Sequence, residues 1–103
     1  MNIVESKIQN IAELCNKHNV DELYVFGSAL TNKFKDSSDI DLLVQFAQVD
    51  ILQYFDNYMT LKEELEKLFD RKIDLVENQT IKNPIFRQIV DRDKKLIYGR
   101  KNS

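Results

Sequence analysis

The sequence predicts a single domain, residues 1–103, of the α/β or α+β class, in which helices pack against a β-sheet. Short β-prone runs alternate with amphipathic stretches, and this alternation is typical of layered folds. The length of 103 residues suits one hydrophobic core, and an apolar fraction of 43% is that of a globular protein. Only two glycines and one proline are present, so each of them marks a positioned feature of the chain.

The first half of the chain is expected to contain a helix, a strand, a short helix and a second strand. Apolar residues recur at helical spacing over residues 3–18, which indicates an amphipathic helix. Residues 23–26 are a β-prone run that stops at Gly27, and they predict a buried strand. Residues 28–34 have room for one or two helical turns, and a polar turn then leads into a strand over residues 39–44.

The second half is expected to contain a long helix, a third strand and a last helix. Apolar residues follow helical spacing over residues 50–69, and a capping-box pattern from Thr60 to Glu63 leaves open whether this helix restarts there. Residues 73–76 predict the third strand. Asn83 and Pro84 suit the N-cap and first position of a helix that extends to about residue 90, and residues 96–98 are a candidate edge strand.

Composition excludes several classes of function. A single cysteine, Cys15, leaves no internal disulfide and no thiolate cluster for a metal, and it indicates the cytosol. No apolar run approaches the roughly 20 residues that span a bilayer. The N-terminus lacks the charged-then-apolar pattern of a signal peptide, so export is not expected. A net charge of -2 argues against broad attachment to nucleic acid, so a polyanionic ligand would have to be neutralised locally, for example by metal ions.

Two aspartates stand close together in the second predicted strand. Because side chains alternate along a strand, Asp39 and Asp41 share one face while Ile40 and Leu42 point to the other. Their Cα atoms should lie roughly 6.5 to 7 Å apart, which lets both carboxylates reach one cation. Hard divalent ions such as Mg²⁺ prefer carboxylates, waters and phosphate oxygens, so this pattern suggests a metal site.

A third carboxylate, Asp74, lies in a similar context in the third predicted strand, between Ile73 and Leu75. If this strand adjoins the second, the three acids can hold two ions about 4 Å apart, an arrangement used for displacement at phosphorus. The plainer alternative is that each aspartate is an ordinary exposed residue. Aspartate is depleted in strands, however, which favours a ligand for the Asp39 and Asp41 pair.

Gly27 and Ser28 follow the first predicted strand. Backbone N–H groups and the serine hydroxyl at such a turn can bind a phosphate. A Gly-Ser pair is by itself more often an ordinary turn, and it is the spacing to the acids that favours phosphate binding.

These residues together carry a resemblance. Gly27 and Ser28, ten intervening residues, Asp39 and Asp41, and then Asp74 in a later strand resemble the nucleotidyltransferase superfamily typified by DNA polymerase beta. More narrowly, the chain resembles the minimal nucleotidyltransferase (MNT) family, whose members often serve as antitoxins paired with a HEPN-domain toxin. The segments that carry this likeness are residues 25–28, 38–44 and 72–76, and it extends over almost the whole chain.

The resemblance implies a nucleotidyltransferase fold with a mixed sheet flanked by helices. It implies that Mg²⁺, as two ions, is held by Asp39 and Asp41, with Asp74 as third ligand or base, and that Gly27 and Ser28 contact the triphosphate of ATP. The activity implied is transfer of AMP from ATP to a tyrosine hydroxyl of a partner HEPN toxin. One departure is visible: family members commonly read Gly-Ser-x-Ala-Arg-Gly, whereas residues 27–32 read Gly-Ser-Ala-Leu-Thr-Asn.

Other functions compete with this one. A binding module would neutralise a partner by covering it, without chemistry, and a small-molecule nucleotidyltransferase would act on an acceptor such as an antibiotic. Calcium binding is a weaker hypothesis. An EF-hand loop that began at Asp36 would need Gly at its sixth position and Glu at its twelfth, and Asp41 and Ala47 occupy these positions.

His18 and the aromatic residues of the long helix are not expected to be catalytic. His18 is expected to be a solvent-facing residue at the end of the first helix. The aromatic residues Tyr54, Phe55 and Tyr58 are expected in the core and at its rim, or on a partner surface.

Overall fold

The computed structural model describes residues 3–27 and 39–99 of the chain. The short helix predicted over residues 28–34 and the polar turn after it lie outside these residues. The described elements follow in this order: η1 (Glu5–Lys7), α1 (Ile8–Lys17), β1 (Val20–Phe26), β2 (Ile40–Phe46), α2 (Ile51–Phe69), β3 (Ile73–Glu77), η3 (Asn78–Thr80), α3 (Pro84–Asp93) and β4 (Lys95–Gly99).

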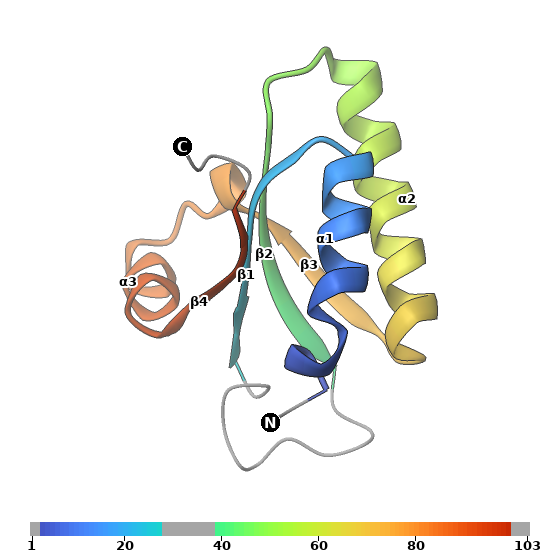
Figure 1. The fold of residues 1–103 in the computed structure, drawn as a ribbon. Helices are drawn as coiled ribbons and strands as arrows, with labels where there is room; N and C mark the ends of the chain where they lie inside the picture. Colours follow the sequence, from blue (N-terminus) through green and yellow to red (C-terminus); the bar gives the residue numbers. More distant parts are fainter. Residues whose placement is uncertain (1–2, 28–38, 100–103) are drawn as a thin grey trace.

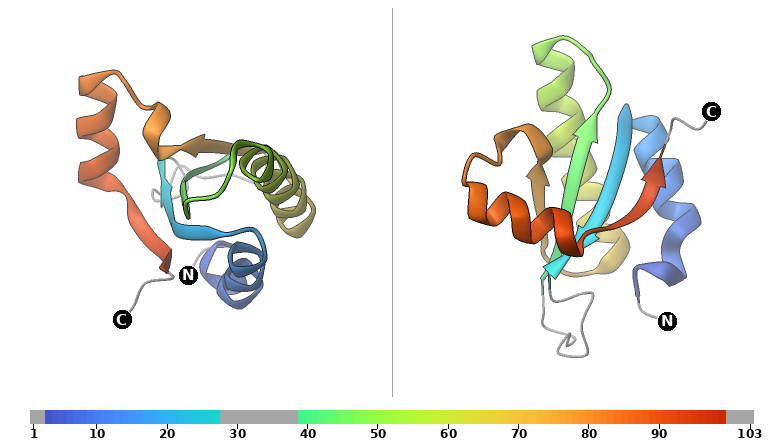
Figure 2. Two further views of the ribbon diagram at one scale, coloured as in Figure 1. Left: turned by 90° about the horizontal axis from the view of Figure 1, so that it is seen from above. Right: turned by 90° about the vertical axis from the view of Figure 1, so that its left-hand side faces the viewer.

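The four described strands form one mixed sheet in the order β3-β2-β1-β4. Strands β2 and β3 are parallel, and β1 is antiparallel to both of its neighbours, β2 and β4. Helices α1 and α2 lie side by side on one face of the sheet, and α3 lies on the other (Figures 1 and 2). The predicted class, a mixed sheet flanked by helices, is confirmed.

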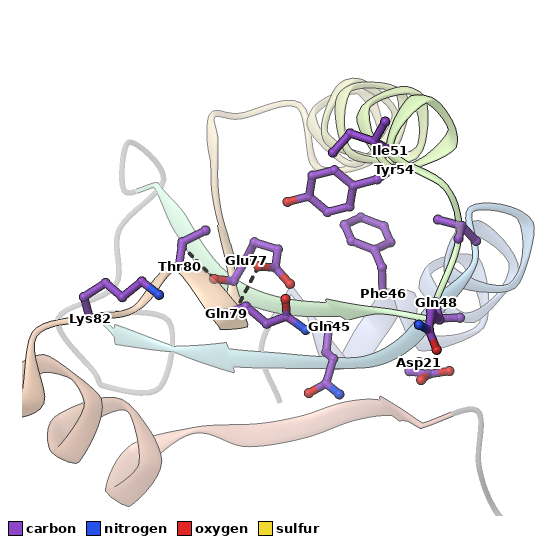
Figure 3. A pocket seen from close by; sticks show the side chains of 12 residues that line it. Asp21, Gln45, Phe46, Gln48, Ile51, Tyr54, Glu77, Gln79, Thr80 and Lys82 are labelled. Atoms are coloured by element: carbon purple, nitrogen blue, oxygen red, sulfur yellow. Dashed lines mark hydrogen bonds between the residues drawn. The ribbon is translucent and has the colours of Figure 1, made fainter.

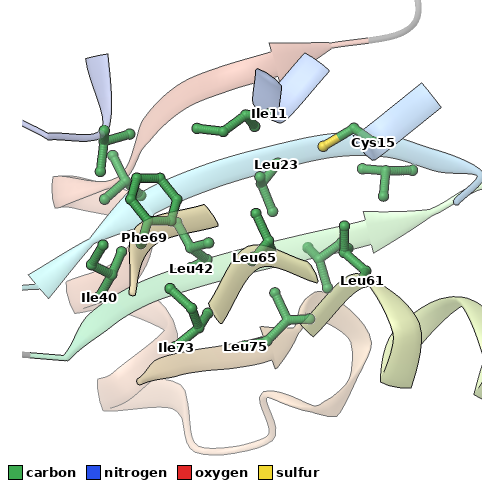
Figure 4. Close-up of a cluster of buried hydrophobic side chains, with 14 of the residues drawn as sticks. Ile11, Cys15, Leu23, Ile40, Leu42, Leu61, Leu65, Phe69, Ile73 and Leu75 are labelled. Carbon is green, nitrogen blue, oxygen red and sulfur yellow. The ribbon is translucent and has the colours of Figure 1, made fainter. Parts of the chain in front are cut away.

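The main core lies between the sheet and the pair of helices α1 and α2. Because side chains alternate along each strand, every second residue of β2 and β3 faces this core. The core includes Ile11, Cys15, Leu23, Ile40, Leu42, Leu61, Leu65, Phe69, Ile73 and Leu75 (Figure 4). Burial raises the pKa of the Cys15 thiol to about 12, so this side chain behaves as an apolar core residue.

The opposite face of the sheet carries a smaller apolar cluster beneath α3. Phe26, Leu43 and Val90 are buried there. Helix α3 begins as predicted, because Asn83 Oδ1 accepts hydrogen bonds from the backbone N–H groups of Ile85 (2.8 Å) and Phe86 (3.1 Å). It ends at Asp93, one turn later than predicted, and β4 follows at once as the expected edge strand.

Helix α2 is continuous from Ile51 to Phe69, so the capping-box pattern does not restart it. The N-cap is Asp50, whose Oδ1 accepts from the Gln53 N–H at 2.9 Å. Its buried residues recur every four positions, at Asn57, Leu61, Leu65 and Phe69, and this packing keeps the helix intact. No helix in the described parts of the chain is long and apolar enough to cross a bilayer.

Two expectations are corrected by tertiary contacts. Strand β1 begins at Val20, before the predicted residue 23, because Asn19 turns the chain at a φ of 62° and Val20 pairs with Phe46. The prediction that His18 faces solvent was wrong. It is buried, and its Nε2 lies 3.0 Å from Glu64 Oε1 of α2.

Candidate active site

The candidate site begins at Gly27, directly after β1. Gly27 has a φ of 77°, which L-residues with a side chain rarely adopt. A Cβ atom there would also overlap the carboxylate of Asp41, whose Cγ would lie 3.1 Å away. The structure therefore needs glycine here for two independent reasons, and it places Gly27 against one of the predicted acids. The other half of the predicted phosphate turn, Ser28, lies outside the described residues.

Two of the three predicted acids lie side by side. Asp41 in β2 is in direct register with Asp74 in the parallel strand β3, and with Phe26 in β1. Because Leu43 and Val76, two positions further along, belong to the cluster beneath α3, both acids are on that face of the sheet. The adjacency of the two strands, which the three-acid prediction required, is confirmed.

Asp39 comes immediately before β2 and is exposed, as is Asp74, while Asp41 is half-buried. The pKa of Asp41 is raised to about 6, first by burial, then by the charge of Asp74 and a hydrogen bond with it, and last by the charge of Asp39. The neighbouring carboxylates therefore add to burial in disfavouring the ionised form of Asp41.

The carboxylates of the candidate site are suitable ligands for a divalent metal ion. Carboxylate oxygens are the donors that Mg²⁺ prefers, and a cation would remove the repulsion at Asp41. Within residues 3–27 and 39–99, however, no group of three or more Asp, Glu, His or Cys side chains is close enough to hold a metal ion. The structure brings Asp41 and Asp74 together, and the three-acid metal site stays a prediction.

An aromatic contact next to the acids was not anticipated from the sequence. The rings of Phe26 and Phe86 meet edge to face, with centroids 6.1 Å apart. Phe86 belongs to an exposed apolar side of α3, together with Ile85 and Ile89. Helical spacing of these residues was the available signal, but it could not show which sheet face α3 would cover.

The predicted aromatic residues of α2 lie elsewhere. Tyr54 and Tyr58 are half-buried against the main core, as expected for rim residues, and Phe55 is exposed. A cavity of about 990 Å³ lies beside Tyr54, and none of the three acids lines it. This cavity and the carboxylate pair of Asp41 and Asp74 are therefore separate features of the structure.

Known proteins resemble this chain both in sequence and in fold. The family described as "Polymerase beta, Nucleotidyltransferase" matches residues 9–103. A Methanocaldococcus jannaschii protein assigned to the protein adenylyltransferases is 37% identical over 86 residues, covering 82% of each chain. The protein adenylyltransferase MntA of Thermococcus cleftensis is 35% identical over 78 residues, covering 76% of each chain.

Solved structures agree with these matches. A minimal nucleotidyltransferase superposes with a TM-score of 0.75 at 28% identity, over 92% of this chain and 95% of the other. A complex of a tri-AMPylated HEPN toxin from Shewanella oneidensis with an MNT antitoxin gives a TM-score of 0.63 at 22% identity, over 94% of this chain and 73% of that one. At that identity the second likeness shows the shared fold. The chain therefore belongs to the polymerase beta nucleotidyltransferase family and, within it, to the minimal nucleotidyltransferases.

Proposed function

We propose that this chain is an adenylyltransferase that moves AMP from ATP to a tyrosine hydroxyl of a partner HEPN-domain toxin and thereby acts as its antitoxin. The observation that carries the proposal is the in-register pair of Asp41 and Asp74 beside Gly27, in a chain of this family. The acceptor is supported by relatives named protein adenylyltransferases and by the AMPylated toxin bound to an MNT antitoxin of the same fold.

Each acid has a proposed role. Asp39 and Asp41 would hold Mg²⁺, and Asp74 would complete a second metal site or accept the proton of the attacking hydroxyl. When bound, the ions would lower the pKa of that hydroxyl and stabilise charge on the departing pyrophosphate. Gly27, which leaves room for the Asp41 carboxylate, would together with Ser28 admit the triphosphate.

The proposed reaction balances without a further reactant. The tyrosine oxygen forms a bond to the α-phosphorus of ATP, and the bond from that phosphorus to the bridging oxygen breaks. Pyrophosphate leaves with the bonding electrons, and the hydroxyl proton passes to Asp74 or to water. The product is a phosphodiester between AMP and the toxin side chain.

The test incubates the protein with its cognate HEPN-domain protein, Mg²⁺ and ATP labelled on the α-phosphate. We expect label on the toxin, located to a tyrosine by mass spectrometry, and loss of transfer in Asp74→Asn. Asp56→Asn, which makes the same charge change at an exposed position of α2, should transfer normally.

A different outcome would favour the binding-module alternative. If the wild type and Asp74→Asn neutralise the toxin equally well and no label is transferred, neutralisation occurs by complex formation alone. A cytoplasmic location is part of the same proposal. It is supported by the single cysteine, Cys15, which is free and buried.

A further inference from the structure

A cavity lies at the carboxyl ends of β2 and β3, and none of the acids of the candidate active site lines it. The cavity of about 990 Å³ lies between these strand ends, the start of α2 and the segment after β3. Phe46, Tyr54 and Glu77 enter it from three different elements (Figure 3). A smaller hollow of about 370 Å³ shares Tyr54 and Glu77 and extends along Phe55 and Tyr58.

Glu77 is the unusual residue of this cavity. It is only 8% exposed, although carboxylates are almost never buried without a partner. Its Oε1 accepts a hydrogen bond from the Gln79 N–H at 3.0 Å, and no ion pair joins it to any residue in the described segments. Burial raises the pKa of Glu77, and the bond from Gln79 offsets only part of that effect.

The cap on η3 does not explain why this residue is acidic. A cap requires one acceptor oxygen, which a neutral side chain also supplies. Glu77 lines the cavity, neither of its oxygens is a fully buried atom without a partner, and no ion pair within the described residues neutralises its charge. A buried charge in this state costs free energy that a positively charged ligand would recover.

The walls beside Glu77 are aromatic. The rings of Phe46 and Tyr54 meet edge to face with centroids 5.4 Å apart, and Tyr54 also contacts Tyr58. Burial, and then the charge of Glu77, raise the pKa of Tyr54, so this ring lies within the electrostatic reach of the carboxylate. Aromatic faces attract organic cations and offer apolar surface to a carbon chain.

The charges that line the cavity also select against other ligands. The acid Glu77 is buried at the cavity, whereas the lining base Lys82 is exposed and its charge is screened by solvent, so an anion is disfavoured. A metal ion needs several oxygen ligands, and no group of three or more metal-binding side chains occurs in the part of the chain that is described.

We propose that this cavity binds a small organic cation, an alkylammonium group whose charge pairs with Glu77 and whose carbon chain lies against Phe46 and Tyr54. The site is separate from the acids of the candidate active site, which do not line it. The proposal therefore goes beyond the proposed function, and its test does not depend on ATP, metal or toxin.

The test is a titration of the full chain with n-butylammonium, followed by two-dimensional amide NMR in the absence of Mg²⁺. We expect saturable shifts of the amide signals of Gln45, Gln79 and Thr80. 1-Butanol, which has a similar shape without the charge, should bind about tenfold more weakly or not at all, because it lacks the charge-assisted hydrogen bond. The neutral variant Glu77→Gln should lose a similar factor.

Matched controls make the result decisive. Glu77→Gln keeps an acceptor for the Gln79 N–H, and Glu63→Gln removes one exposed charge from α2 outside the cavity, so it should bind like the wild type. Equal binding of the ammonium and the alcohol to wild-type protein would overturn the proposal, whether or not the variant folds. Shifts gathered around Asp41 and Asp74 instead would also overturn it.

Discussion

The ionised carboxylate of Asp41 lowers the stability of the folded protein when no cation is bound. Its carboxylate is half-buried, lies in register with Asp74 and fills the space that a side chain at position 27 would need. A pKa raised to about 6 means that the ionised form is disfavoured in the folded state. A carboxyl group whose folded pKa is raised destabilises the protein once the pH exceeds the unfolded pKa near 3.9.

We therefore expect Asp41→Asn to stabilise the metal-free protein while abolishing transfer. At pH 7.5 the gain should be roughly 1–2 kcal/mol after allowance for solvent screening, and it should vanish near pH 3, where Asp41 is protonated in both states. Denaturant unfolding at the two pH values measures this. Asp56→Asn should show no such gain. A destabilised Asp41→Asn protein at pH 7.5 would mean that the carboxylate has a structural role.

Gly27 is constrained both by its backbone conformation and by its neighbour Asp41. Gly27→Ala should lower stability by at least about 1 kcal/mol, because a methyl group there meets both a positive φ and the Asp41 carboxylate. Gly99→Ala is a matched control, since its Cβ would lie 3.6 Å from Leu96 Cδ2, an ordinary contact. Thermal unfolding of both variants tests the difference. Equal melting temperatures would show that the turn relaxes without cost.

Among the elements, α1 and α2 are joined by a polar contact as well as by the core. Glu64 of α2 lies 3.0 Å from His18 Nε2 and 3.5 Å from Lys17 Nζ, at the end of α1. These partners lower the pKa of Glu64, first through the hydrogen bond with His18. A buried histidine next to a carboxylate fixes how the two helices sit against each other.

The contact between Glu64 and His18 predicts that the stability of the protein depends on pH. Because the folded pKa of Glu64 is lowered, its contribution is fully present above the unfolded pKa near 4.3 and is lost as the pH falls through the folded value. Glu64→Gln should therefore be less stable than the wild type at pH 6, and the two should converge as the pH falls below the lowered folded pKa of Glu64. Urea unfolding across this range measures the difference, with Glu63→Gln as the exposed control. A constant difference at all pH values would contradict the argument.

Viewed as a whole molecule, the sheet separates two regions of different chemistry. The acids lie at the start of β2 and β3 on the α3 face, and the cavity with Glu77 lies where the same strands end. The overall charge of -2 offers no general attraction for a triphosphate. Any nucleotide must therefore be accommodated by local groups and cations.

We accordingly expect Mg²⁺ and ATP together, but not ATP alone, to raise the melting temperature. The carboxylates repel a triphosphate unless cations lie between them, and a ligand stabilises only the state that binds it. Differential scanning fluorimetry with ATP, Mg²⁺, both and neither provides the measurement. Asp39→Asn should reduce the joint shift. An equal shift with ATP alone would count against a metal-dependent site.

The sequence by itself determined the class of fold and predicted the chemistry of the site. Alternation of apolar residues located the strands that carry Asp41 and Asp74, and Asn83 with Pro84 located the start of α3. These signals are local, because the spacing of apolar residues and the capping of a helix depend on residues only a few positions away. The pattern of glycine and acids was specific enough to predict the family.

Only the tertiary structure decided which residues meet. The pairing of β2 with β3, the steric need for Gly27 against Asp41 and the burial of His18 on Glu64 join residues that are distant in sequence. Glu77 gave no signal, because a glutamate at a strand end is ordinary until packing buries it. Burial and register depend on how all the elements pack together, so no local pattern encodes them.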